Sequence, residues 1–291
     1  MNSSALGAVL AAVLLAGCGG GAAAPDANVE EQIGFDAEGA AVRRTQVESA
    51  IRDCMRSGGF DYVPIDPAAQ KAALVGGANL SDAEFQKQYG DGISTLYEQR
   101  RSPKALGSAN ATIRAALTAP ERIAYDRALF GDQVDATFEK ALDTGDFSLL
   151  GGCTKNAADA VFGGTEVLVS LQGKLDELDQ RIIADVRMVK VIADWSQCMR
   201  AAGYELPNPD EVDIQLKSAL QVIVGPPDGP AKAYDPVALA ELQRLEVAMV
   251  NADQACEEKH IAKVDQEVRT EYEKAFREAN AALISKVPAL K

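Results

Sequence analysis

Apolar residues recur every three or four positions along most of this chain, and the alternating, β-branched runs typical of strands are nearly absent. One such pattern predicts a single amphipathic helix from about Thr165 to Ala202. A second begins at Asp235-Pro236, a strong helix start, and ends before Pro288. A short helix is predicted between them, over about 210–224. The pattern therefore predicts an all-α protein.

The part of the chain before these long helices is also predicted to be helical. Its first helix ends at Gly59, and residues 60–67 are expected to be extended, because Pro64 and Pro67 disfavour helix in the residues before them. Ser81-Asp82-Ala83-Glu84 and Thr118-Ala119-Pro120-Glu121 have the spacing of a capping box, which predicts a helix start at each.

A ten-residue segment occurs twice, at 51–60 and 195–204. Both copies contain Cys-Met-Arg-x-x-Gly followed by an aromatic residue, Phe60 or Tyr204. In each copy the cysteine lies on the apolar stripe near the last turn of a helix, and the glycine falls where a left-handed residue ends the helix. We expect the aromatic ring to pack back on the methionine. Each copy therefore predicts a helix stop, and methionine and aromatic residues at this spacing are typical of a core.

The N-terminus has a different character. Met1 through Leu15 are uncharged, and Leu15-Ala16-Gly17-Cys18 resembles the bacterial lipobox, in which the cysteine carries a diacylglyceryl group. Residues 1–17 are therefore predicted to be a lipoprotein signal peptide, although the leader lacks the usual Lys or Arg. Residues 18–37 are predicted to form a flexible tether. This arrangement predicts a protein anchored to the cell membrane through lipid on Cys18, on the extracytoplasmic face.

An uncleaved membrane helix over Ala5–Ala24 is the alternative interpretation of the leader. The stretch carries no charge and is about long enough to span a bilayer. The glycines at positions 17, 19, 20 and 21 make it a poor membrane helix.

Four cysteines remain when Cys18 is set aside, and an even number in an exported chain predicts disulfides. Three pairings are possible. If the two repeat copies belong to equivalent modules, Cys54 pairs with Cys153 and Cys198 with Cys256; crossed pairings are the alternative. The second pairing would set the two long helices antiparallel. The predicted fold is thus two helical modules, 38–163 and 164–288, the second a long antiparallel helical hairpin, cross-linked by disulfides.

The formal net charge of −14 limits the partners of the folded body. Nucleic acid is excluded and anionic lipid headgroups are disfavoured, because both attract clustered Lys and Arg. The acidity is typical of a surface that stays soluble outside the cell.

The chain contains few residue patterns typical of catalysis or metal binding. His260 is the only histidine, and no Gly-x-Ser-x-Gly, His-Glu-x-x-His or phosphate-binding glycine loop is present. Cys256 and His260 are one helical turn apart, but a soft-metal site needs more ligands. Three pairs of acidic residues could bind calcium or act as acid and base, yet none has EF-hand spacing, and helix caps are the favoured interpretation: Asp132 with Asp135, Asp143 with Asp146, and Asp210 with Asp213. We therefore assign no catalytic residue, cofactor or metal.

The remaining candidate for a ligand-binding loop is Tyr89-Gly90-Asp91-Gly92-Ile93-Ser94. Two glycines in a short loop allow the backbone to approach a ligand closely. A tight turn between helices is the favoured alternative.

Several segments of the chain resemble uncharacterised secreted lipoproteins of high-GC Gram-positive (actinobacterial) bacteria. The resemblance covers most of the first module and the second less tightly. It implies export and disulfides, and it adds no catalytic residues. The matching segments are Cys54-Met55 with Gly59-Phe60, residues 89–94, residues 117–125 with 128–131, and Gly151-Gly152-Cys153.

Three hypotheses for function follow. The preferred one is a non-enzymatic binding or scaffold module of the bacterial cell envelope, whose partner is an envelope protein or polymer. The second is a solute-binding lipoprotein of a transporter, which would need two α/β lobes. The third is an envelope hydrolase with paired carboxylates facing each other across a cleft. The sequence sets no oligomeric state.

Overall fold

The computed structural model describes residues 29–34, 37–77, 80–100, 108–133, 137–138, 141, 146–226 and 233–290. Within these ranges the protein is all-α, with helices and connecting turns and no strand, as the periodicity predicts. The predicted signal peptide, Cys18 and most of the predicted tether lie outside the described residues. No helix in the described ranges is both long enough and apolar enough to cross a membrane.

The chain divides into two compact units that interleave along the sequence. Unit 1 comprises Met1–Gln70, Gly107–Gln180 and Thr270–Lys291, and unit 2 comprises Lys71–Leu106 and Arg181–Arg269. Each unit therefore takes segments from both of the predicted modules, 38–163 and 164–288.

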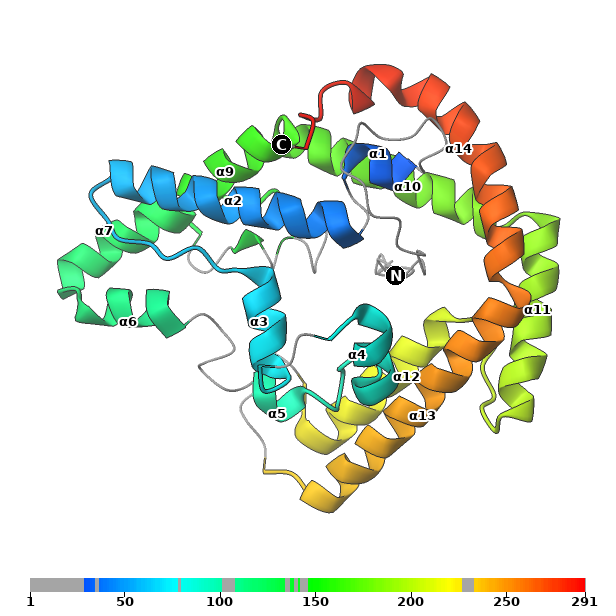
Figure 1. The fold of residues 1–291 in the computed structure, drawn as a ribbon. Helices are drawn as coiled ribbons and strands as arrows, with labels where there is room; N and C mark the ends of the chain where they lie inside the picture. The colour runs from blue at the N-terminus through cyan, green and yellow to red at the C-terminus, as the bar shows by residue number, and fades with distance from the viewer. Residues whose placement is uncertain are drawn as a thin grey trace, which may run out of the picture. The chain divides into compact units, whose positions relative to one another are not determined.

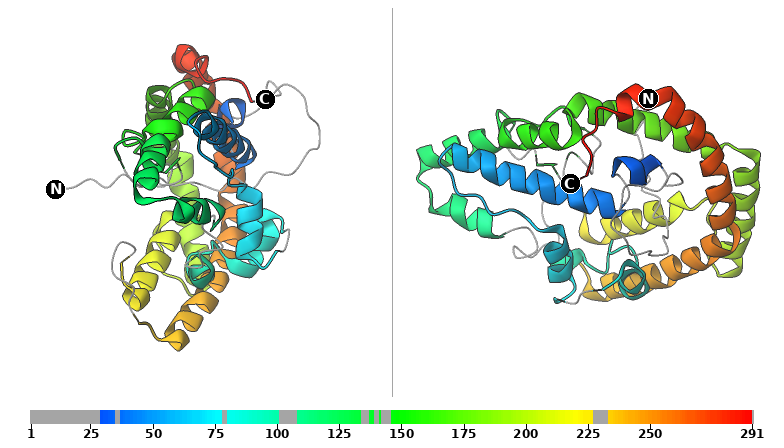
Figure 2. Two further views of the ribbon diagram at one scale, coloured as in Figure 1. Left: turned by 90° about the vertical axis from the view of Figure 1, so that its left-hand side faces the viewer. Right: turned by 45° about the horizontal axis from the view of Figure 1, so that its top comes forward.

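In unit 1, α2 (Ala37–Ser57) packs along α9 (Gly152–Phe162), and α7 (Ala119–Phe130) packs against the same helix (Figure 1, Figure 2). Shorter helices α1 (Val29–Ile33) and α6 (Ser108–Ala116) complete this part, with most of α10 (Thr165–Ile183). The core is built from the apolar stripes of these helices, chiefly Val47, Ile51, Met55, Tyr125, Leu129, Ala157, Ala158, Val161 and Phe162. Burying these stripes is the main favourable contribution to folding.

In unit 2, α13 (Pro236–His260) is the central helix. It contacts α4 (Asp82–Tyr89), α11 (Val186–Ala201) and α12 (Asp210–Val224). The one-turn helix α5 (Tyr97–Arg100) follows the loop after α4. Two further helices have residues in both units: α3 (Pro67–Leu74) and α14 (Ala262–Ile284).

Both predicted capping boxes are present. Glu84 accepts a hydrogen bond from the Ser81 amide at 2.9 Å and starts α4. Glu121 accepts one from the Thr118 amide at 2.8 Å and starts α7. Each carboxylate thereby satisfies an amide that the helix itself leaves without a partner.

The two disulfides join Cys54 to Cys153 and Cys198 to Cys256, with Cα atoms 5.6 and 5.8 Å apart. This is the pairing predicted for equivalent modules. The first bridge links the last turn of α2 to α9, and the second links the last turn of α11 to α13.

Both copies of the repeat end their helices in the same way. The Phe60 amide donates to the Met55 carbonyl at 3.0 Å, and the Tyr204 amide donates to the Met199 carbonyl at 2.9 Å. The glycine between them has a positive φ in each copy, 81° and 98°. These bonds form the Schellman geometry that the sequence predicts.

The prediction of two unbroken long helices is wrong. The first splits into α10 and α11, because the Asp185 carboxylate accepts the Arg187 amide at 2.8 Å and begins a new helix. The second splits at Ile261 into α13 and α14. The long helical hairpin as predicted is therefore not confirmed, although α11 and α13 do pack together.

Candidate functional site

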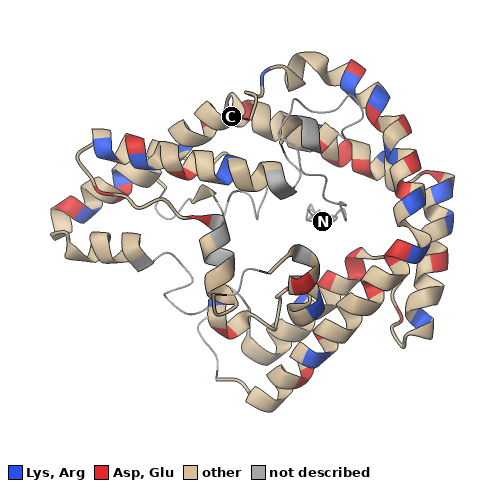
Figure 3. Ribbon diagram, viewed as in Figure 1, with Lys and Arg blue, Asp and Glu red and all other residues tan. Residues whose placement is uncertain are grey.

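Three of the features singled out in the sequence fall in unit 2. They are the loop 89–94, the acidic pair Asp210 and Asp213 on α12, and the pair Cys256 and His260 on α13. Figure 3 marks acidic positions on both α12 and α13. We therefore treat this part of unit 2 as the candidate site.

The loop after α4 closes around a carboxylate of the protein itself. Glu246 of α13, which is 0% exposed, accepts hydrogen bonds from the amides of Ile93 at 2.7 Å, Ser94 at 2.7 Å and Thr95 at 3.1 Å. The Ser94 hydroxyl donates to the same carboxylate at 2.5 Å. Successive backbone amides of this kind form an anion-binding concavity. Here a side chain of the protein fills it.

The geometry at position 90 shows why the loop needs glycine there. Its φ is +61°, and a Cβ atom at this position would lie 2.9 Å from Cγ of Glu246. The close approach expected of a glycine loop is therefore made, but to an internal carboxylate. The interpretation of this loop as a turn between helices fits its geometry better than that of an open ligand site.

Three further carboxyl groups near this loop have raised pKa values. Burial, followed by the charges of Asp213 and Glu246, raises the pKa of Asp91 to about 6. Burial also raises the pKa of Asp253 to about 7, although its hydrogen bond from Trp195 opposes the shift. Burial and then the charges of Asp253 and Asp91 raise the pKa of Glu257 to about 8. These groups therefore exchange protons near neutral pH.

The elements of unit 2 bring these groups together. Asp91 lies in the loop after α4, and Asp253 and Glu257 lie one turn apart on α13. The Trp195 indole of α11, fully buried, donates to Asp253 at 2.9 Å. On α12, Asp213 pairs with Lys217 at 2.6 Å. We name Asp91, Asp213, Asp253 and Glu257 the carboxylate cluster.

Cys256 and His260 do not form a metal site. Cys256 is in a disulfide, so it has no thiolate to offer a metal. In the described ranges, no group of three or more His, Cys, Asp and Glu side chains is arranged to hold a metal ion.

The other acidic pairs are described only in part. Asp132 is exposed and lies 4.0 Å from Arg127. Asp146 accepts hydrogen bonds from the Ser148 amide at 3.0 Å and from its hydroxyl at 2.6 Å, which form a local turn; no described helix begins there, so this is not the helix cap expected. Asp135 and Asp143 lie outside the described residues.

Several buried charges escaped the sequence analysis, including Glu273 of α14 and Asp126 of α7. Two others are Glu246 and Arg43 of α2 in unit 1, which is 2% exposed. Both interrupt an apolar stripe: Arg43 is one turn before Val47, and Glu246 is one turn after Leu242. A charged residue on an otherwise apolar helix face was the signal that could have revealed them.

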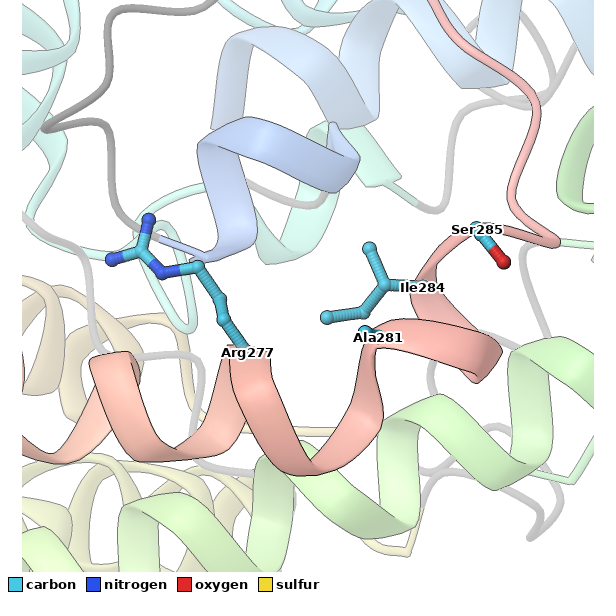
Figure 4. A pocket seen from close by; sticks show the side chains of 4 residues that line it. All are labelled: Arg277, Ala281, Ile284 and Ser285. Carbon is cyan, nitrogen blue, oxygen red and sulfur yellow. The ribbon is translucent and has the colours of Figure 1, made fainter.

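A hollow of ≈310 Å³ lies on the C-terminal half of α14, in unit 1 (Figure 4). Its described lining is Arg277, Ala281, Ile284 and Ser285. Arg277 donates to Glu273 at 3.2 Å, and no acid–base pair lines the hollow in the described part of the chain.

Comparison with protein-family models, with curated proteins and with solved structures finds no match to this chain.

Proposed function

We propose that the protein is a non-enzymatic binding or scaffold module of the bacterial cell envelope, anchored on the extracytoplasmic face through lipid on Cys18. Two disulfides support export, because such bonds persist in oxidising compartments and are rare in the cytosol. The lipobox-like Leu15-Ala16-Gly17-Cys18 supports the anchor.

One observation supports a non-enzymatic role: the residues that could take part in catalysis or ligand binding contact other parts of the protein itself. The glycine loop encloses Glu246, and four cysteines form two disulfides. Groups used in this way hold the fold together and do not face a substrate. A module of this kind acts through its surface.

Exposed aliphatic side chains at the junction of α10 and α11 are the surface we favour for contact. Val186 is 79% exposed and Val189 55%, and Ile183 on the preceding turn is also exposed. Clustered exposed apolar residues are typical of protein–protein contact surfaces, whereas single ones are common everywhere. The partner we favour is accordingly an envelope protein.

The anchor is tested by fatty-acid labelling in a Gram-positive host. We expect the full chain to incorporate a clickable palmitate analogue and its Cys18→Ser variant to incorporate none. Intact mass should show a mature chain that begins at Cys18. An unacylated product that keeps residues 1–17 would overturn this part of the proposal.

The contact surface is tested by crosslinking in intact cells. A Val186→Glu/Val189→Glu double variant should lose a specific crosslinked partner that the unaltered protein retains. Val222→Glu is the matched control, because Val222 on α12 is also 79% exposed. A partner retained by the double variant, or recovery of a small molecule alone, would contradict a protein-binding role for this surface.

An envelope hydrolase is the second candidate, and the raised pKa values of Asp253 and Glu257 favour it. A carboxyl that keeps its proton near neutral pH can act as a general acid. Hydrolysis of an envelope polymer by the purified protein, abolished by Glu257→Gln, would establish this role. A solute-binding protein has less support, since the described residues contain no strand from which to build α/β lobes.

A further inference from the structure

Two helices pack on α13 in unit 2, and they are held in different ways. The disulfide Cys198–Cys256 ties α11 to α13 covalently, whereas α12 is held by non-covalent packing through Val212, Leu216 and Val224. Any change in repulsion across the carboxylate cluster should therefore move α12 before it moves α11.

Most of the charged side chains that act on the carboxylate cluster are acidic. They come from the loop after α4, from α12, from α13 and from the start of α14. Among the basic residues of the described ranges, Lys217 lowers the pKa of Asp91, and it is already paired with Asp213. The groups are Asp91 in the loop, Asp210, Asp213 and Lys217 on α12, Glu246, Asp253 and Glu257 on α13, and Asp265 on α14.

Hydrogen bonds hold two of these positions. The buried Trp195 donates to Asp253 at 2.9 Å, and the loop amides donate to Glu246. These bonds keep the two carboxylates in place as charge builds up around them. Helix α12, which carries Asp210 and Asp213, is instead held on α13 by packing.

We propose that the carboxylate cluster is a proton-dependent latch, which keeps α12 packed on α13 when Asp91, Asp253 and Glu257 are protonated and loosens α12 when these three groups ionise. The device responds to the acidity of the medium around the folded body. It requires neither the lipid anchor nor the contact surface proposed above.

The direction of the effect follows from proton linkage. Carboxyls with raised pKa values bind more protons in the folded state than in the unfolded state, where their pKa values are about 4. Their stabilising contribution is therefore fully present below about pH 4, and it is lost as pH rises through 6 to 8. We expect α12 to be tightly held at pH 5.5 and loosened at pH 8.5.

Hydrogen exchange on the oxidised protein tests the latch. Protection factors, corrected for the intrinsic effect of pH, should fall at least tenfold in α12 between pH 5.5 and pH 8.5, since one pKa unit corresponds to a tenfold change in equilibrium. Helix α9 of unit 1 is the internal reference and should change less than threefold. Constant protection of α12, or an equal loss in α9 and α12, would overturn the proposal.

Variants of single carboxyl groups show which residues cause the pH dependence of α12 protection. Glu257→Gln and Asp253→Asn should keep α12 protected at pH 8.5, within threefold of its value at pH 5.5. Glu258→Gln is the matched control: this neighbour on α13 is exposed, and the variant should keep the full tenfold fall. A Glu257→Gln variant that keeps the unaltered protein's pH response contradicts the latch.

If those variants do not fold, carboxyl ¹³C NMR of the unaltered protein tests the latch. Three Asp or Glu carboxyls should titrate between pH 6 and 8, in step with amide shifts in α12. Midpoints near 4 for every Asp and Glu, or titration without any response in α12, would overturn the proposal.

Discussion

A buried charge interrupts an apolar helix stripe in each unit, Arg43 in unit 1 and Glu246 in unit 2, and the two charges are stabilised by opposite means. In unit 1, Arg43 donates to the carbonyls of Ile33 at 2.9 and 2.6 Å, Val161 at 2.9 Å and Pro288 at 3.0 Å. In unit 2, Glu246 accepts from the amides of one short loop. Both charges are satisfied mainly by backbone groups.

The difference lies in where the backbone groups come from. Ile33 ends α1, Val161 lies in the last turn of α9, and Pro288 follows α14, so Arg43 joins three segments distant in sequence. Carbonyls at helix ends lack intrahelical partners and carry the negative end of the helix dipole, which suits a guanidinium. Arg43 also lies 5.3 Å from the centroid of the Phe162 ring. Glu246 instead shapes a single loop, 93–95.

The comparison implies that Arg43 matters more for tertiary structure than Glu246. Arg43→Met keeps the length of the side chain but leaves three carbonyl groups without their donor. We expect a loss of about 3–5 kcal/mol in the free energy of unfolding, because each buried carbonyl left without a donor costs about 1–3 kcal/mol; urea denaturation measures this loss. Arg56→Met, exposed on the same helix, is the control and should stay within about 0.5 kcal/mol. Equal effects of the two variants would refute the role assigned to Arg43.

Glu246→Gln should have a smaller effect. The amide oxygen can still accept from the loop, but the charge is lost and the amide nitrogen faces other donors. We expect a loss of about 2 kcal/mol in the free energy of unfolding, together with weaker hydrogen-exchange protection of residues 93–95. Glu258→Gln is the matched control, and a neutral result for both would show that the loop does not depend on this carboxylate.

Gly90→Ala tests the tight turn of the loop against Glu246 without changing any charge. Gly90 and Gly76 both have a positive φ, +61° and +71°, but a Cβ at Gly76 meets nothing within 4 Å. With its ψ of −136°, Gly90 also lies outside the left-handed helical region, in a conformation that is strained for any residue with a side chain. Gly76→Ala therefore reports a positive φ without a contact, about 1 kcal/mol. We expect Gly90→Ala to cost at least about 1 kcal/mol more by thermal or urea unfolding, from backbone strain and the contact with Glu246 together. Equal losses would show that neither effect operates at Gly90.

Local features of this protein were predictable from sequence, because short-range interactions decide them. The capping boxes at Ser81 and Thr118, and the glycine stops at Gly59 and Gly203, depend on residues within about one turn. The disulfide pairing also followed, since the repeat marks Cys54 and Cys198 as equivalent positions.

The candidate site was predictable only in outline. The loop at 89–94 was singled out, but its ligand is Glu246, about 150 residues further along the chain. The helix break at Asp185 was missed, because a capping side chain and a continuing helix compete there and the apolar periodicity runs through both.

From its sequence this protein could be predicted to be helical, several of its helix starts and stops could be placed, and one cysteine pairing was favoured over the crossed alternatives. The tertiary structure alone decided that residues before position 163 and after it share the same compact units, that Arg43 and Glu246 are buried, and that the acidic side chains of α12 and α13 act on one another. The reason is physical: caps and turns are stabilised by neighbours in the chain. A buried charge is stable where the fold brings hydrogen-bonding groups from elsewhere in the chain to it, and these carboxyl pKa values are raised chiefly because packing removes water.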